Sequence, residues 1–548
     1  MPRIVLGPTL RYVDQRRATI WVQTDVPCEV EVLGARERTW CVCGLHFALL
    51  TVEGLAPGAD HPYEVALDGE RAWPEDGSSW PASTIRLLAP DRALDVVFGS
   101  CRITRPHEPP HALRADEHPD GQGIDALRAY ALRCAAADAT AKPDMLLMLG
   151  DQIYADQPSP ALQETLAARD RPADAPPDEL ADFCDYALAY GEAWSDPAIR
   201  WLLSTVPVTT VFDDHEIHAE WRISQGWLDE MNAEPWFDRH IRAGLAAYWV
   251  FQHIGNLPPE ELRAGGLYNL VCEAQDAGDL LSAAMDTEGR QTGHSRWSFV
   301  RELGDARLVV IDSRAGRDVT PGARELIRDE EWAWIREQAT RPTRHLLLAS
   351  SVPFLLAPGL HHGEAFDEAL ADGARGGRVG AWAGERLRRI AVMDHWASFQ
   401  RTFHRLAELL DDVAHGRCGD APASVVMLSG DVHHCYLAEV GFRHGSEARS
   451  PVWQAVCSAF RKELAPHERR ILAFGHTALA ERLARRLARG TGVAPLPLDW
   501  RVVERPAYGN QVATLTLDGD QARVRVEAVV DGTWRDPRLA LAFARDLT

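Results

Sequence analysis

Four short segments of the chain each place polar side chains directly after an apolar, strand-like run. The segments are VVFGSCR, MLLMLGDQIY, VTTVFDDHE and VVMLSGDVHH. The polar residues that they deliver are Cys101, Asp151, Tyr154, Asp213, Asp214, His215, Asp431 and His433. Because open α/β sheets bind ligands at the carboxyl ends of their strands, we expect these side chains to meet in one site.

The residue types of this set indicate a metal centre. Adjacent carboxylates such as Asp213 and Asp214 are costly to hold together unless a cation lies between them. Hard oxygen ligands select hard or borderline cations. A thiolate at Cys101 and a phenolate at Tyr154 need a strongly acidic metal, and ferric iron fits that need better than magnesium. Asp151 could bridge two metals about 3.5–4 Å apart, the spacing used for in-line displacement at phosphorus.

Other histidines near these segments are expected to play no part in the site. His434 follows His433 and should point the opposite way if the strand continues. The pair His361-His362 in APGLHHGE is expected to lie in a surface loop, although it could line the mouth of a substrate pocket. The serines after the run HLLLAS have no G-x-S-x-G elbow around them, which argues against a serine hydrolase.

The elements that would position the site fall into two regions. Residues 1–90 show short strands of period two with frequent turns, which predicts a small all-β sandwich with a structural or docking role. From 91 to 548 strands alternate with helices, which predicts an α/β catalytic domain. We expect surface excursions at about 156–182 and 255–293. A C-terminal hairpin around Asp518-Gly519 could close a sheet edge.

Composition narrows the class of protein. The chain has 548 residues and a net charge of −22, which disfavours bulk binding of nucleic acid or of anionic membranes. The arginine-rich run around 482–489 is expected to be a solvated helix face. No apolar run approaches the ~20 residues of a membrane span. Ten cysteines without a CxxC pair, and no export signal in the opening residues, predict a cytoplasmic protein with reduced thiols.

The motifs GSCR, GDQIYAD, FDDHE and SGDVHH, in this order, resemble those of the PhoD-like alkaline phosphatases of the metallophosphoesterase superfamily. The leading β region is similar to the fibronectin type III-like module that precedes many such domains. The resemblance implies a four-layer αββα sandwich around a centre of ferric iron and calcium. Without an export signal, manganese, zinc or magnesium could replace calcium.

The resemblance also implies a role for each residue of the site. Cys101, Asp151 and Tyr154 would bind the iron, and Asp431 and His433 would form the last metal-binding loop. His215 occupies the position of the family's catalytic histidine. Whether Asp213 or Asp214 is the ligand stays open.

We therefore hypothesise that a metal-activated hydroxide hydrolyses phosphate monoesters or diesters. His215 would protonate the leaving oxygen or hydrogen-bond a phosphoryl oxygen. Arg102 and Arg314 could clamp a small phosphate-ester substrate, or each could form a structural ion pair. The alternatives are another substrate, such as a phospholipid or a nucleotide-sugar, and a degenerate module that binds a phosphorylated ligand or protein without turnover. Nothing in the sequence specifies an oligomeric state.

Overall fold

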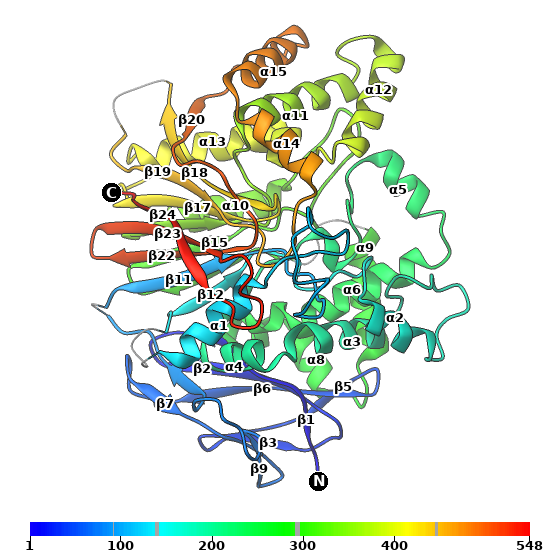
Figure 1. Cartoon of the computed structure of the whole chain (residues 1–548), viewed down its shortest axis with the longest axis vertical. Coiled ribbons are helices and arrows are strands. Elements are labelled where there is room, and N and C mark those ends of the chain that lie inside the picture. Colours follow the sequence, from blue (N-terminus) through cyan, green and yellow to red (C-terminus); the bar gives the residue numbers. More distant parts are fainter. Residues whose placement is uncertain (91, 138–141, 291–295, 444–447) are drawn as a thin grey trace.

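The computed structural model describes residues 1–548 except 91, 138–141, 291–295 and 444–447, and its N-terminal part is all β (Figure 1). The strands there are β1 (Ile4–Val13), β2 (Arg17–Thr24), β3 (Glu29–Val32), β4 (Ala35–Arg38), β5 (Trp40–Val42), β6 (Leu45–Glu53), β7 (Asp60–Pro62), β8 (Val65–Leu67), β9 (Glu70–Trp73) and β10 (Thr84–Arg86). Sheets β1-β2-β6-β5 and β4-β3-β8-β9 enclose apolar side chains such as Ile20, Val30 and Leu50, and β7 pairs with β10. The predicted all-β module is confirmed.

Two larger sheets form the rest of the chain. The first contains β11 (Leu94–Gly99), β12 (Met145–Met148), β13 (Val208–Thr210), β22 (Gln511–Asp518), β23 (Gln521–Val529) and β24 (Leu539–Asp546), in the order β13-β12-β11-β22-β23-β24. The strands β11, β12 and β13 are parallel to one another, whereas β22 pairs antiparallel with β11. The hairpin predicted around Asp518-Gly519 is present. It does more than close an edge, because β22 lies inside the sheet.

The second sheet has mixed strand directions. Its strands are β14 (Phe299–Leu303), β15 (Ala306–Val310), β16 (His345–Ala349), β17 (Ser424–Ser429), β18 (His434–Phe442), β19 (Val452–Val456) and β20 (Leu498–Val502), with β21 (Ala507–Tyr508) paired to β18. Their order is β14-β15-β16-β17-β19-β18-β20. Alternate residues of both sheets, such as Leu147 and Val426, share one buried apolar cluster, so the two sheets pack face to face.

Helices cover the outer faces of both sheets. Beside the first sheet lie α1 (Ala126–Ala136), α2 (Pro160–Ala167), α3 (Phe183–Trp194), α4 (Pro197–Thr205), α5 (Gln225–Met231), α6 (Phe237–Phe251), α7 (Pro259–Ala264), α8 (Leu267–Glu273) and α9 (Gly278–Arg290), with short 3-10 turns η2 (Asp214–Glu216) and η3 (His253–Gly255). On the other side α10 (Asp329–Ala339), η4 (Trp396–Ser398) and α13 (Gln400–Ala414) pack against the second sheet. Next to η4 lies α11 (Pro358–Ala371), which contacts α12 (Gly377–Ile390), α14 (Pro466–Gly475) and α15 (Ala478–Gly490). The result is a four-layer αββα sandwich.

Two of the sequence expectations concern connecting segments. The segment 156–182 carries α2, and the segment 255–293 is mainly helical, although its last residues lie outside the described ones. The expectation that His361 and His362 lie in a surface loop is wrong. Both are buried in α11, where the ring of His361 packs against Phe403 and Trp500. No helix in the described part of the chain is long and apolar enough to cross a bilayer.

The strands that carry the polar motifs end at one edge of the sandwich. Gly99 of β11 pairs with Met148 of β12, and Met148 pairs with Thr210 of β13. The three segments that follow these strands therefore leave the sheet side by side. Gly150 has a φ of 109°, and a Cβ there would lie 2.5 Å from the Cβ of Asp213. Glycine at this position therefore lets the loops after β12 and β13 approach closely.

Candidate metal centre

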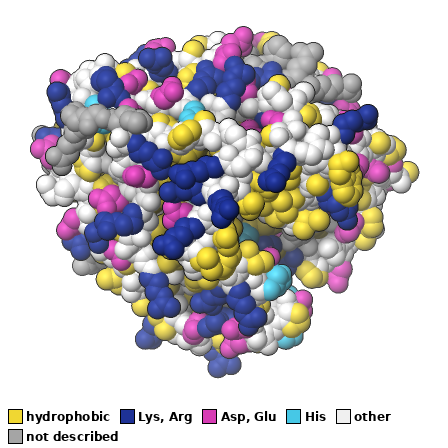
Figure 2. All heavy atoms as spheres, turned by 90° about the horizontal axis from the view of Figure 1, so that it is seen from above, with side chains coloured by type: hydrophobic (Ala, Val, Ile, Leu, Met, Phe, Trp, Pro, Cys, Tyr) yellow, Lys and Arg dark blue, Asp and Glu magenta, His cyan; other side chains and the backbone are white. Residues whose placement is uncertain are grey.

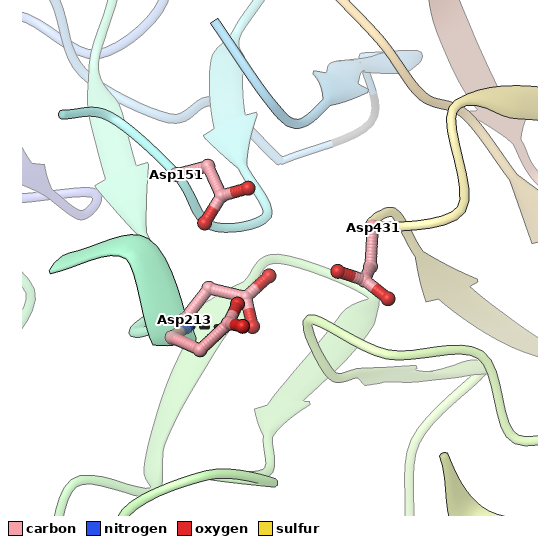
Figure 3. A group of neighbouring side chains, drawn as sticks. Asp151, Asp213 and Asp431 are labelled. Carbon is pink, nitrogen blue, oxygen red and sulfur yellow. Dashed lines mark hydrogen bonds between the residues drawn. The ribbon is translucent and has the colours of Figure 1, made fainter. Parts of the chain in front are cut away.

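Four carboxylates meet where these strands end. One oxygen from each of Asp151, Asp213, Asp214 and Asp431 lies within 4.8 Å of the others. Figure 3 shows Asp151 and Asp213 on adjoining loops, with Asp431 reaching toward them from the second sheet. The side chains are largely buried, so their mutual repulsion is weakly screened. This cluster brings together residues that are up to 280 positions apart in the chain.

The hydrogen bonds of these carboxylates leave oxygens free for a cation. Oδ1 of Asp151 and Oδ2 of Asp213 are buried and have no hydrogen-bond partner, and Oδ1 of Asp214 has only the ion pair with Arg314 at 3.2 Å. Burial and the neighbouring charges raise the pKa of Asp151 to about 7, and they raise the pKa of Asp213 well above its ordinary value. A buried carboxylate without a donor is costly, and a hard cation at this position would remove that cost. The donor set thus fits a metal centre.

The backbone at the ends of the strands is sharply bent. Cys101, Asp151, Asp431 and His433 have φ values of 57°, 54°, 65° and 50°, the left-handed region that L residues rarely adopt. Such conformations concentrate at functional sites, where the surrounding structure holds them. Here these left-handed residues turn the backbone sharply in the loops that follow β11, β12 and β17. The loop of Cys101 and the loop of Asp151 are tied together, because the Cys101 N–H donates to the Gly150 carbonyl at 3.2 Å.

Glu216 holds two of these loops in place. Its Oε1 accepts from the Gln152 N–H at 2.8 Å and from the Gln252 side chain at 3.1 Å. Its Oε2 accepts from the N–H groups of Asp151 at 3.3 Å and Asp213 at 3.0 Å. Burial and the charge of Asp151 raise the pKa of Glu216 to about 8. Glu216 lies in the FDDHE motif, but no role was predicted for it.

Arg314 lies among the carboxylates. Its guanidinium pairs with Asp213, with Asp214 at 3.2 Å and with Asp431 at 3.1 Å. It also pairs with Asp394, which Arg317 contacts at 2.9 Å. This arrangement supplies positive charge inside the cluster. Arg314 therefore lies in the site, and the contacts of its guanidinium are ion pairs with protein carboxylates.

His215 is held against Asp156. The Nδ1 of His215 lies 2.7 Å from Oδ1 of Asp156, and its ring lies 4.3 Å from the Tyr154 ring. Burial by itself would lower the pKa of His215, but the carboxylates of Asp156 and Asp151 outweigh it and raise the pKa to about 10. The Tyr154 hydroxyl donates to Oδ2 of Asp151 at 3.2 Å. Tyr154 and His215 therefore border the carboxylates, as the motifs predicted.

Cys101 is fully buried beside the same carboxylates. Its Sγ lies 3.1 Å from the Ser100 hydroxyl and 3.7 Å from the Asp431 carbonyl oxygen. Burial, and then the charges of Asp151 and Asp431, raise the pKa of the thiol well above its usual value. A raised pKa favours the protonated thiol, and a cation bound next to this sulfur would favour the thiolate, a soft anionic ligand.

His433 and Lys462 complete this side of the site. The backbone N–H of His433 donates to the Ser458 hydroxyl at 3.2 Å, and burial lowers the pKa of the imidazole to about 3, which keeps a nitrogen lone pair free. The ammonium of Lys462 lies 4.7 Å from the centre of the Tyr154 ring and donates to Gln157 at 2.9 Å. The sequence analysis missed Lys462, which follows β19, another strand that ends at this edge.

His395, a largely buried histidine, contacts the side chain of Asp431 and orients it. Nε2 of His395 lies 3.1 Å from Oδ2 of Asp431, and its Nδ1 lies 2.7 Å from Oε1 of Glu364. The Ser398 hydroxyl donates to the other oxygen of Glu364 at 3.1 Å. His395 lies in the loop between α12 and η4, far from any strand end. No sequence signal of the kind used above could have found it.

The side chains of two residues within the motifs, Arg102 and His434, point away from the carboxylates. The guanidinium of Arg102 donates to Asp125 at 2.9 Å and to the Ala193 carbonyl at 2.6 Å, so its side chain forms the structural ion pair that the sequence allowed as an alternative to a phosphate clamp. The left-handed turn at Cys101 directs the side chain of Arg102 toward α1 and α3. His434 contacts the Val432 carbonyl and His476.

Comparisons with known proteins agree with this architecture. A family model described as PhoD-like phosphatase matches residues 121–489, and one described as a domain of unknown function (DUF7800) matches residues 1–85. A solved structure described as that of PhoD aligns with a TM-score of 0.58 at 14% identity, covering 99% of this chain and 90% of that chain. A purple acid phosphatase from yellow lupin (Lupinus luteus) seeds gives 0.45 at 11% identity, with 99% and 73% covered. No curated protein matches.

Proposed function

Because the chain belongs to the PhoD-like phosphatase family, we propose that its carboxylate cluster is a metal-dependent site that hydrolyses phosphate esters. The observation that carries this proposal is the set of buried aspartate oxygens without hydrogen-bond partners, at the point where four motif-bearing strands end. Buried anionic oxygens in this number are stable only next to positive charge, and phosphate chemistry uses such charge.

The metal ligands that we propose are Cys101, Asp151, Tyr154, Asp213 or Asp214, Asp431 and His433. The mixture of thiol, phenol and carboxylate supports ferric iron together with calcium, or with manganese, zinc or magnesium in its place. When bound, such ions acidify the attacking water and stabilise the charge of the phosphoryl oxygens. Before they bind, Arg314 balances part of the carboxylate charge.

The chain's own residues would then bind and protonate the substrate. Asp156 fixes the ring of His215 through Nδ1, which leaves Nε2 to donate to a phosphoryl oxygen or to the leaving oxygen. Lys462, beside Tyr154, places a second donor on the same side. His395 positions Asp431 through the contact with its Oδ2. We propose that both phosphate monoesters and diesters fit this scheme.

Turnover of p-nitrophenyl phosphate and of bis-p-nitrophenyl phosphate tests the proposal. In Asp151→Asn and Asp431→Asn we expect hydrolysis and bound metal to fall together. The matched control is Asp367→Asn, because Asp367 is also a buried aspartate but pairs with Arg388 away from the cluster. Wild-type turnover in both site variants would contradict the assignment. Bound metal without turnover of either substrate in the wild-type protein would favour the degenerate binding module.

A further inference from the structure

One end of the molecule exposes large apolar side chains on three neighbouring helices. About half of the large hydrophobic side chains that are exposed in the described part of the chain lie on α12, α14 and α15. They are Val379, Trp382 and Ile390 on α12, Ile471 and Phe474 on α14, and Leu479, Leu483 and Leu487 on α15. We call this surface the helical cap face. The three helices pack around α11 at the top of Figure 1.

The apolar side chains of the cap face point to solvent because small residues and one arginine fill the inward faces. The buried positions of α12 are Gly384, where a Cβ would lie 2.5 Å from the backbone of Ala371 on α11, and Arg388, which pairs with Asp367 of α11, so neither is a large apolar residue. On α15 the inward position is Ala480, which packs over Gly359 of α11. Trp382 is 66% exposed on the side of α12 opposite Gly384. This is the reverse of the usual helix of a globular protein, which buries its large apolar residues.

The cap face is also basic. The segments 375–392 and 466–490 contain 11 arginines, no lysine and 3 acidic residues, within a chain whose net charge is −22. Eight of these arginines are exposed and have no ion-pair partner among the described residues: Arg375, Arg378, Arg386, Arg469, Arg470, Arg482, Arg486 and Arg489. Figure 2 looks onto this end of the molecule and shows hydrophobic side chains gathered beside arginines and lysines. The net charge of the chain therefore hides a strongly positive face.

We propose that the cap face binds the surface of anionic lipid bilayers. Exposed Trp, Phe and Leu beside unpaired arginines are the combination by which helices lie in the headgroup region, where the apolar groups insert and the arginines meet lipid phosphates. A second copy of this chain fits the face poorly, because each copy would present its own arginines to those of the other. The binding is peripheral, since none of these helices is long enough to span a bilayer.

The cap face is joined to the metal centre by short segments. The loop after α12 carries Asp394 and His395, which contact Arg314 and Asp431. Lys462 precedes the first residue of α14 by only a few positions. Binding at a bilayer would therefore hold the site close to phosphate esters at that surface.

Co-sedimentation with vesicles tests this inference on the full chain. We expect the protein to sediment with vesicles of equimolar phosphatidylglycerol and phosphatidylcholine, and to remain in the supernatant with phosphatidylcholine alone. Arg482→Gln/Arg486→Gln should weaken binding about 30-fold, because each arginine near an anionic bilayer strengthens binding roughly fivefold. Trp382→Ser should weaken it roughly tenfold or more.

Matched controls separate the cap face from general effects. Arg523→Gln/Arg538→Gln removes two exposed arginines elsewhere, each paired with an aspartate, and Leu541→Ser removes an apolar side chain that is 60% exposed on β24. These controls should bind as the wild type does. No sedimentation with anionic vesicles at low salt, or equal losses in the controls, would overturn the proposal. A wild-type dimer that Trp382→Ser dissociates in sedimentation velocity would assign the face to a second copy instead.

Discussion

Replacing Glu216 by glutamine should lower the stability of the protein and weaken metal binding, although the two side chains have nearly the same size and shape. Each carboxylate oxygen of Glu216 accepts two N–H donors, from Gln152 and Gln252 on one side and from Asp151 and Asp213 on the other. An amide has one oxygen, so its NH2 group must face two donors whichever way it turns. Two buried donors then lose their acceptor, at about 1–3 kcal/mol each, so the loss in the free energy of unfolding is about 2–6 kcal/mol.

The assay combines urea unfolding, followed by circular dichroism, with calorimetric titration of Mn²⁺. Unfolding is measured with Mn²⁺ present, because positive charge in the cluster favours the ionised form of Glu216. We expect lower stability together with weaker Mn²⁺ binding, since Asp151 and Asp213 lose the contacts that fix their loops.

Glu368→Gln is the control for this experiment. Glu368 is also a buried glutamate, but both of its oxygens accept from one donor, the N–H of Gln400, so an amide oxygen can still serve it. This variant should lose less stability and bind Mn²⁺ as the wild type does. Wild-type stability and wild-type Mn²⁺ affinity in Glu216→Gln would refute the reasoning.

Three further predictions concern single side chains. Arg314→Met should destabilise the metal-free protein by about 3–5 kcal/mol, because it leaves buried carboxylates unpaired. Thermal unfolding should show that Mn²⁺ recovers part of the lost stability, and a melting temperature equal to that of the wild type would contradict this prediction. Lys462→Gln should raise KM for p-nitrophenyl phosphate roughly tenfold, whereas Arg102→Gln should lower the melting temperature and leave KM unchanged; the opposite pattern would restore Arg102 as a phosphate clamp. His361→Phe should stabilise the protein by about 1–3 kcal/mol, because both ring nitrogens of His361 are buried without partners. Burial holds the pKa of His361 well below 6.5, so the wild type loses stability as the pH falls below that value. Urea unfolding should therefore show that His361→Phe stabilises the protein more at about pH 5 than at about pH 7.5.

The sequence predicted the residues that lie at strand ends and missed those that reach the site by other routes. An apolar strand followed by Gly and Asp is a local pattern, so the segments of Asp151 and Asp431 could be recognised without knowing the fold. Lys462 lies six residues after the end of β19 and without a Gly-Asp pair, so this rule could not have found it. His395 lies after a helix, and only the folded chain brings it to Asp431.

Side-chain direction and strand order were harder to predict than the identity of the elements. Arg102 adjoins Cys101, but the left-handed turn at Cys101 directs the arginine toward Asp125. The position of β22 beside β11 depends on pairing between segments that are about 400 residues apart. The alternation of apolar and polar residues within a strand does not indicate which strand pairs with it. The exposed apolar stripe of α12 has the same period as a buried one, so the pattern alone could not show which way it faces.

The position of β22 also has a consequence for synthesis on the ribosome. The strand that leads to Cys101, β11, lies between β12 and β22, and β22 ends at Asp518. A ribosome that adds roughly 5–20 residues per second delivers β22 on the order of tens of seconds after β11 has emerged. During that interval one edge of β11 has no partner from its own sheet and is a template for pairing with another nascent chain. We therefore expect newly made chains to be most prone to pair wrongly before their last strands arrive.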